Sequence, residues 1–298
     1  MSYSLTGYKL FFQDLSVNEP IIHSDTLYGM ILDSLYTLKL LPDKSTPEFD
    51  FSVSSAFPFY GEYLFFPIPL DFCEKFPNRY IDNQKMLFIS QNLLENYFTE
   101  TPERIYQSGC FLAEENHPIH MVHPIYKTVV FPIYSGDICH TLKSIRFRKD
   151  AGLYFFVRTQ SKNAEKQISI ALNFLKDQGI GKKRNSGRGN FIFTKFKTDL
   201  NIQSNEKSIL ISLYHPQKED VGKDFFKTSL SHWIKRTKKP LFGTEKDSKY
   251  LRMAKEGTVF FKTPSKPIGS VSKLFNKNKQ CDTPIYRIGK AFLIGNKR

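Results

Sequence analysis

The stretch Gly179-Ile180-Gly181-Lys182-Lys183-Arg184-Asn185-Ser186-Gly187-Arg188-Gly189 places four glycines around a strongly basic centre. Glycine permits positive φ angles and a close approach of the backbone to a ligand, so backbone N–H groups can point at phosphate oxygens. The basic side chains supply compensating charge, and the Asn and Ser between them add neutral hydrogen bonds. The stretch therefore predicts a loop that binds a phosphate backbone. The alternative is a flexible basic connection without a ligand.

Two better-known glycine motifs do not fit this loop. A P-loop requires Gly-Lys followed by Ser or Thr, but Lys182 is followed by Lys183, so no hydroxyl is placed for magnesium. A dinucleotide-binding fingerprint follows a strand and opens a helix. Here an apolar stripe predicts a helix before the loop, and the alternation of residues 190–196 predicts a strand after it. The stripe consists of Ala164, Ile168, Ala171, Leu172 and Leu175.

Further elements are predicted on both sides of the loop. Strands are expected at 8–12, 129–134, 153–159, 208–214, 257–263 and 285–295, with a hairpin at 57–70 that turns at Gly61. Helices are expected from the start of an apolar stripe at Leu27 to Pro42 and the Pro47 region, at 93–98 and at 223–235, the last carrying Trp233. Ser24 or Asp25 is placed to cap the first of these. Residues 72–140 have the pattern of an insertion or arm. Strand–helix–strand pieces in both halves favour two α+β domains with antiparallel sheets.

Charge is distributed unevenly along the 298 residues, whose formal net charge is +14. Residues 1–139 contain 8 Lys+Arg and 17 Asp+Glu, whereas residues 140–298 contain 35 and 12. A chain that is acidic in one half and basic in the other can bind a polyanion on one surface and protein neighbours on the other. This asymmetry favours nucleic acid as a partner. The alternative is a solvated, lysine-rich surface.

Composition also bears on the cellular compartment of the protein. The longest nearly apolar run, Tyr63 to Leu70, has eight residues, whereas a membrane helix needs about 18. The N-terminus lacks the basic start and apolar stretch of a signal peptide. The four cysteines have no paired short spacing and are predicted to be reduced thiols. They are Cys73, Cys110, Cys139 and Cys281. We therefore expect a cytoplasmic protein without a membrane segment.

Together with the glycine loop, four further segments occur in an order seen in one known family. They are IHSDTLYGMI at 22–31, FPFYGEYLFFPIPL at 57–70, KEGTVF at 255–260 and IYRIGKAFLIG at 285–295. In these segments the sequence resembles the CRISPR-associated RAMP superfamily, and within it the fourth-subunit (Cas-five-like) group of type III-A Csm effector complexes. The resemblance spans nearly the whole chain. Residues 110–140 depart from it, so an arm that inserts between nucleotides cannot be placed by matching.

The resemblance implies a fold, a function and a set of binding residues. The fold would be two ferredoxin-like (RRM-like) domains, at 1–200 with an insertion at about 72–140 and at 201–298, with the glycine loop at the end of the first. The function would be a non-catalytic RNA-binding subunit in antiviral defence, with no cofactor and no metal. It would anchor the 5′ handle of the CRISPR RNA (crRNA) and link the large polymerase-like Csm subunit to the backbone RAMP subunit. RNA-binding residues would be His23, Ser24, Gly179, Gly181, Lys182, Lys183, Arg184, Asn185, Ser186, Gly187, Arg188 and Gly189, with Arg146, Arg148, Trp233 and Arg236 as further candidates.

Two functions besides that of an RNA-binding subunit remain open. A His beside a hydroxyl and a carboxylate at residues 23–25 is compatible with acid–base chemistry. The chain would then be a RAMP-fold endoribonuclease that processes precursor crRNA, although such enzymes carry their glycine loop near the C-terminus and 109 residues follow Gly189 in this chain. A generic RNA chaperone is the third possibility. Zinc at His117, His120 and His123 is disfavoured, because Pro118 and Pro124 oppose a regular helix and residues three apart point to opposite faces of a strand. Trp233 is either a base-stacking residue or a core residue.

Overall fold

The computed structural model describes most of the chain. The described residues are 3–17, 19–41, 51–76, 88–99, 104–122, 124–135, 138–159, 161–181, 187–200, 202, 206–237, 250–274 and 285–295.

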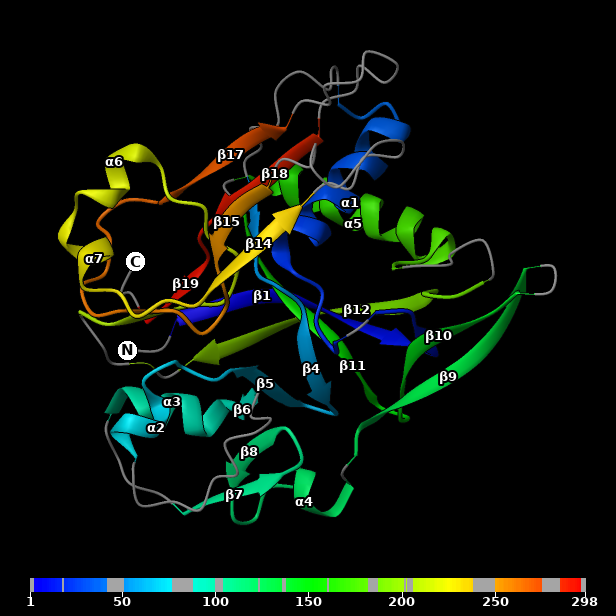
Figure 1. Cartoon of the computed structure of the whole chain (residues 1–298), viewed down its shortest axis with the longest axis horizontal. Helices are drawn as coiled ribbons and strands as arrows, with labels where there is room; N and C mark the ends of the chain where they lie inside the picture. Colours follow the sequence, from blue (N-terminus) through cyan, green and yellow to red (C-terminus); the bar gives the residue numbers. More distant parts are fainter. Residues whose placement is uncertain are drawn as a thin grey trace.

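A nine-stranded sheet forms the middle of the molecule (Figure 1). Its strand order is β12-β1-β11-β4-β5-β6-β8-β7, and β3 pairs with β11 beside β4. The described pairs are antiparallel except that of β6 with β8. The strands are β1 (Tyr3–Phe12), β3 (Phe51–Val53), β4 (Phe57–Tyr60), β5 (Tyr63–Pro67), β6 (Phe88–Ser90), β7 (Ile105–Ser108), β8 (Phe111–Glu114), β11 (Ala151–Thr159) and β12 (Phe191–Leu200). The predicted strands at 8–12, 153–159 and 190–196 and the hairpin around Gly61 are confirmed.

Helices α1 (Ser24–Thr37) and α5 (Lys162–Gln178) pack together beside the sheet (Figure 1). All five residues of the predicted α5 stripe are buried, and the Ser161 hydroxyl caps this helix by accepting a hydrogen bond from the Ala164 N–H at 3.1 Å. The phenol oxygen of Tyr8 on β1 lies 3.0 Å from the Ser169 hydroxyl oxygen on α5. An apolar stripe on each helix therefore covers a sheet face rich in buried aromatic rings.

Some of residues 72–147 extend the large sheet, and others form a projecting hairpin. The segments α2 (Phe72–Lys75), α3 (Gln91–Thr99) and α4 (Ile119–Val122) accompany the strands that extend the sheet, and α3 confirms the helix predicted at 93–98. Strands β9 (Tyr126–Ser135) and β10 (Ile138–Phe147) form a long hairpin that pairs with β2 (Asp14–Leu15). Figure 1 shows this hairpin reaching away from the body of the molecule. Within the predicted insertion, the hairpin is thus the part that projects as an arm.

The C-terminal part consists of small sheets around a second, smaller core. One sheet contains β13 (Ser208–Leu210), β16 (Val259–Phe260) and β19 (Leu293–Ile294). Two ribbons pair β14 (Trp233–Thr237) with β15 (Tyr250–Ala254) and β17 (Gly269–Leu274) with β18 (Ile285–Lys290). Helices α6 (Lys218–Val221) and α7 (Asp224–Lys227) lie at the periphery (Figure 1). The second core contains Leu210, Tyr214, Phe225, Ala254, Phe260 and Ile268.

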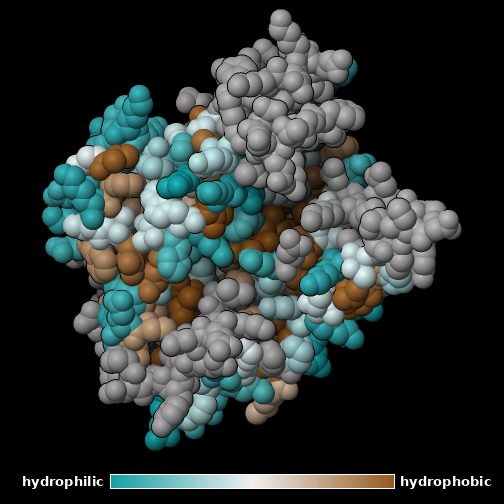
Figure 2. Space-filling model, in the orientation of Figure 1, coloured by the Kyte–Doolittle hydropathy of each residue, from teal (hydrophilic) through white to brown (hydrophobic). Residues whose placement is uncertain are grey.

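These elements form a mixed α+β fold with a large, mainly antiparallel sheet, as the sequence predicts. The division at residue 200 into two ferredoxin-like domains stays a prediction. Figure 2 shows hydrophilic residues over much of the described part of one face, with apolar ones between them. In the described part of the chain, no helix is both long and apolar enough to span a bilayer.

The helix expected at 223–235 is wrong. Helix α7 ends at Lys227, where the hydroxyl groups of Thr228 and Ser229 donate to the backbone carbonyls of Asp224 and Phe226. Such bonds compete with the helical ladder at its end. The following Trp-Ile-Lys-Arg-Thr sequence alternates and pairs as β14 with β15. Trp233 therefore lies on a strand.

Candidate nucleic-acid interface

The base of the glycine loop is tightly closed. Gly179 ends α5, the Ile180 N–H donates to the Gly189 carbonyl at 2.9 Å, and the Gly189 N–H donates to the Asp14 carbonyl of β2 at 3.0 Å. The four glycines have positive φ angles of 76°, 96°, 68° and 79° in chain order, a conformation that L side chains rarely adopt. The predicted need for glycine is therefore confirmed. Lys182, Lys183, Arg184, Asn185 and Ser186 lie outside the described residues.

Arg188 connects the loop to the projecting hairpin. Its guanidinium carbon lies 3.9 Å from the centre of the Phe131 ring on β9, and Nη1 donates to the Ser144 hydroxyl on β10 at 3.1 Å. Stacking on an aromatic face and directed hydrogen bonds are the interactions that suit arginine. The end of the loop at Arg188 thus packs against the hairpin. An RNA contact by Arg188 stays a prediction.

His23 is held by a buried carboxylate from the C-terminal part. Its Nδ1 lies 2.8 Å from Oε1 of Glu256, which also accepts a hydrogen bond from the Ser55 hydroxyl. The Glu256 side chain is 2% exposed, whereas that of His23 keeps 18% of its surface in water. The buried Glu256 carboxylate therefore orients the imidazole, and part of the ring remains exposed to water.

Capping of α1 by Ser24 or Asp25 is wrong, because His23 is the N-cap residue and makes no side-chain cap bond. Ser24 is buried, and its hydroxyl accepts a hydrogen bond from the Leu213 N–H at 2.8 Å. Its N–H donates to the Ser55 hydroxyl at 2.9 Å. The first turn of α1 is thus a junction between the two parts of the chain, with the Ser24 hydroxyl directed inward.

Asp25 is the centre of this junction. Arg236 on β14 donates to both carboxylate oxygens, from Nε at 2.9 Å and from Nη2 at 2.7 Å, and Arg287 on β18 donates from Nη1 at 3.1 Å. The Asp25 side chain is fully buried, and each arginine side chain keeps 21% of its surface in water. Arg236, a candidate RNA contact from the sequence, is thus bound within the chain. Sequence reasoning missed both Asp25 as an arginine acceptor and Glu256.

The other candidate cations lie at the root of the hairpin. Arg146 on β10 makes a two-pronged ion pair with Asp14, at 2.8 and 3.0 Å. Arg148 follows the end of β10 and donates to the Val122 carbonyl, so only Arg146 of the two lies on the strand. With Lys149 they border a cavity of about 520 Å³ next to the strand that supports the glycine loop. A basic cavity there is compatible with phosphate, although Asp14 neutralises part of the charge.

His117 and His120 serve the local fold. His117 is buried, which lowers its pKa, and its ring packs against Tyr63 and Phe65. The two ring nitrogens of His120 make hydrogen bonds, Nδ1 with the Ser108 hydroxyl and Nε2 with the Glu114 carbonyl. Among the described residues, no group of three potential metal ligands gathers. His123 and Cys281 lie outside the described residues, as does the side chain of Cys139, whereas Cys73 and Cys110 are free thiols.

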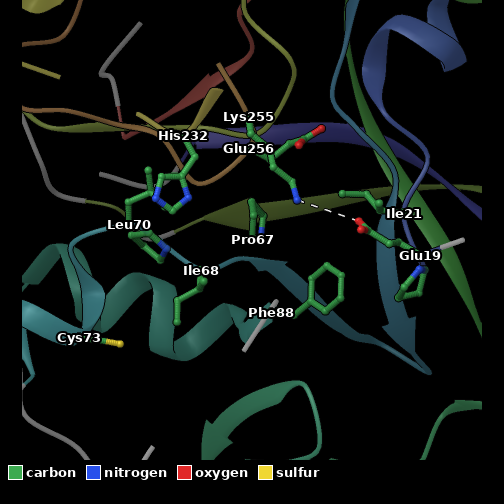
Figure 3. A pocket seen from close by; sticks show the side chains of 12 residues that line it. Glu19, Ile21, Pro67, Ile68, Leu70, Cys73, Phe88, His232, Lys255 and Glu256 are labelled. Carbon is green, nitrogen blue, oxygen red and sulfur yellow. Dashed lines mark ion pairs between the residues drawn. The ribbon is translucent and has the colours of Figure 1, made fainter. Parts of the chain in front are cut away.

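A further cavity lies where residues 19–21, 67–73 and 255–256 meet (Figure 3). Its volume is about 310 Å³, and its walls are mainly apolar. Figure 3 shows the Lys255 ammonium directed across it towards Glu19, with the paired atoms 4.0 Å apart. The Glu256 carboxylate turns away from the cavity, towards His23. None of the residues predicted to bind RNA lines this cavity.

Burial and charge act in opposite directions on Glu256. Burial alone would raise the pKa of its carboxyl, but His23, by its charge and hydrogen bond, and the Ser55 hydroxyl lower it below its ordinary value of 4.5. A carboxyl with a lowered pKa in the folded state contributes stability that is fully present above its unfolded pKa. That contribution is lost as the pH falls through the folded pKa.

We therefore expect Glu256→Gln to flatten the loss of stability on acidification. Urea denaturation at several values from about pH 6 to about pH 3 measures this dependence. The matched control is Glu115→Gln, which removes a half-exposed carboxylate 3.8 Å from Arg104. The control should keep the wild-type slope. An unchanged slope in Glu256→Gln would show that the buried carboxyl is not the group that titrates.

The fold of the chain can be compared with those of solved structures. A large antiparallel-rich sheet has two helices packed beside it, and a glycine loop leads from the second helix into an edge strand. The structure is similar to a chain of the Csm3–Csm4 subcomplex of a type III-A CRISPR–Cas interference complex, with a TM-score of 0.72 and 16% identity over 99% of this chain and 100% of that one.

The structure is also similar to a chain of a Csm1–Csm4 cassette bound to pppApA, with a TM-score of 0.64 and 18% identity over 99% and 98% of the two chains. The same values hold for a cassette bound to AMPPNP. Csm4 is the component that these complexes share, so the predicted resemblance to a Csm4-like RAMP protein is confirmed at the level of the fold. No protein-family model and no curated protein sequence matches the chain.

Proposed function

We propose that this chain is a non-catalytic RNA-binding subunit of a type III-A CRISPR (Csm) complex. In this role it anchors the 5′ handle of the crRNA and links the large polymerase-like subunit to the backbone RAMP subunit. The observation that carries the proposal is a fold match over 99% of the chain to both Csm1–Csm4 and Csm3–Csm4 assemblies. The glycine loop is closed at its base by backbone hydrogen bonds and contains a basic stretch. Its backbone N–H groups and cations are suited to binding phosphates.

The division of charge supports two kinds of partner. Residues 140–298 contain 35 of the 43 basic residues and include the loop, so their surface suits RNA. Residues 1–139 are net acidic and suit protein neighbours. A subunit that joins two proteins around an RNA end needs both surfaces on one chain.

The first test follows labelled repeat-derived RNA as it binds to the purified chain at several salt concentrations. The double variant Lys183→Ala/Arg184→Ala should bind more weakly and flatten the dependence of log affinity on log salt by about one to two. Because loop cations contact phosphates, preference among RNA sequences should change little. The control is Lys218→Ala/Lys223→Ala, which removes two exposed cations near α6. Equal affinity of the loop variant and the wild type would refute the assignment of the loop.

A second candidate function is an endoribonuclease that processes precursor crRNA with His23 as general base. One observation favours it: the carboxylate of Glu256 orients the imidazole as a general base requires. The same incubation distinguishes the two functions. RNA that is bound and remains intact supports the subunit, whereas specific cleavage that disappears in His23→Ala supports the nuclease.

A further inference from the structure

The ribbon formed by β14 and β15 turns one face to the core, and most of its other face is exposed to solvent. On that second face Ala254, the partner of Trp233, is buried. In its register, Ile234 pairs with Met253 and Arg236 pairs with Leu251, and these four residues share the inner face. Met253 is fully buried, and Arg236 binds Asp25. The ribbon is therefore fixed to α1 through its inner face.

The outer face carries two aromatic rings and two cations. Trp233, Lys235, Arg252 and Tyr250 alternate with the inner residues, and the register places Lys235 directly opposite Arg252. Trp233 is 43% exposed and Tyr250 51% exposed. The charged residues described on this face of the ribbon are both basic.

The aromatic rings are held in place while remaining accessible. The Phe226 ring meets Trp233 edge-on, with the ring centres 6.2 Å apart, and the Lys235 ammonium lies 5.1 Å from the centre of the Tyr250 ring. Tyr250 pairs with Thr237, four residues beyond Trp233, so the rings lie about 13 Å apart along the ribbon with the cations between them. Along this face the Lys235–Arg252 pair therefore lies between the Trp233 and Tyr250 rings.

We propose that this outer face binds a short stretch of single-stranded RNA, separately from the glycine loop. Bases stack on Trp233 and Tyr250, and Lys235 and Arg252 hold the intervening phosphates. Aromatic platforms interleaved with cations bind unpaired nucleic acid in this way, because every base has a stacking face and every linkage carries a charge. The inference rests on the proposed function for its ligand and adds a second contact to it.

RNA fits this surface better than a protein does. A protein interface buries its aromatic residues within a patch whose centre is poor in charge. Here the centre of the face is the Lys235–Arg252 pair, and the rings lie at its ends. A repeating polyanion complements that order. Docking of a partner protein on the same face is the alternative outcome of the test.

Trp233 is the sole tryptophan of the chain, so its fluorescence reports on this face alone. The full chain is titrated with a fluorescently labelled uridine oligomer, and RNA anisotropy and tryptophan emission are followed in the same sample. Stacking should quench the emission with the same midpoint as the rise in anisotropy. Trp233→Ala and Tyr250→Ala should each weaken binding about fivefold or more, and Trp233→Phe should restore most of the affinity. Tyr106→Ala, which removes a ring 38% exposed on β7, is the control and should bind like the wild type.

The outcomes separate the inference from the proposed function. A rise in anisotropy without quenching, and with Trp233→Ala binding like the wild type, overturns the second contact and leaves the glycine loop as the RNA site. No rise in anisotropy with any RNA refutes the proposed function and the inference together. Emission that changes only when another Csm subunit is added identifies the face as a protein interface and overturns the inference. Circular dichroism of each variant verifies that it is folded.

Discussion

Replacing Asp25 by alanine is expected to lower the free energy of unfolding by about 3 kcal/mol. The carboxylate is fully buried and accepts three hydrogen bonds from two arginines, so its removal leaves two guanidinium groups in the interior without their shared counter-charge. Breaking a buried pair in this way costs about 3–5 kcal/mol, and the lower end applies because both arginines retain 21% exposure.

Urea denaturation followed by circular dichroism measures this change. The matched control is Asp14→Ala, which removes the partner of the exposed Arg146 and should change stability little. Because Asp25 joins α1 to β14 and β18, its loss should also speed proteolysis of the C-terminal ribbons. Similar denaturation midpoints for Asp25→Ala and Asp14→Ala would contradict the role of Asp25 as a buried junction.

Replacing Gly189 by alanine is expected to reduce RNA affinity about tenfold or more and to lower the melting temperature. A Cβ at this position would lie 1.9 Å from the Ile180 carbonyl oxygen, and because that oxygen is a backbone atom, no change of side-chain conformation can relieve the clash. The φ angle of 79° adds strain. The bond between the Ile180 N–H and the Gly189 carbonyl, which closes the base of the loop, must therefore break or shift.

Gly187→Ala is the matched control for this variant. It has a similar φ of 68°, but a Cβ there would meet nothing within 4 Å, so it carries the strain of the left-handed conformation without the clash. Anisotropy with labelled repeat-derived RNA and thermal unfolding measure both variants. If Gly189→Ala retains the affinity of Gly187→Ala, the closed base of the loop is not what organises the binding site.

Local patterns could be predicted because their causes lie within a few residues. The α5 stripe has a period of 3.6 residues, the hairpin turn lies at Gly61, and the loop glycines take the positive φ angles that glycine favours. The same reasoning failed at Trp233, where alternation and helical amphipathicity are hard to distinguish over five residues.

Long-range contacts could not be predicted because no local pattern encodes them. Glu256 and His23 are separated by 233 residues, and Arg287 and Asp25 by 262. A carboxylate in the first turn of a helix is usually a cap or a solvated charge, so the sequence favoured that interpretation of Asp25. The parallel pairing of β6 with β8 likewise depends on the path of residues 88–114 through the sheet.

In the proposed function, the chain joins the large and backbone Csm subunits and binds the 5′ end of a crRNA. The most direct measurement is reconstitution of the chain with the large and backbone Csm subunits and crRNA, analysed by mass photometry with footprinting of the RNA. We expect the large subunit to join the backbone only when this chain is present, and the 5′ handle then to become protected. Complexes that join all other subunits and protect the handle in its absence would contradict it.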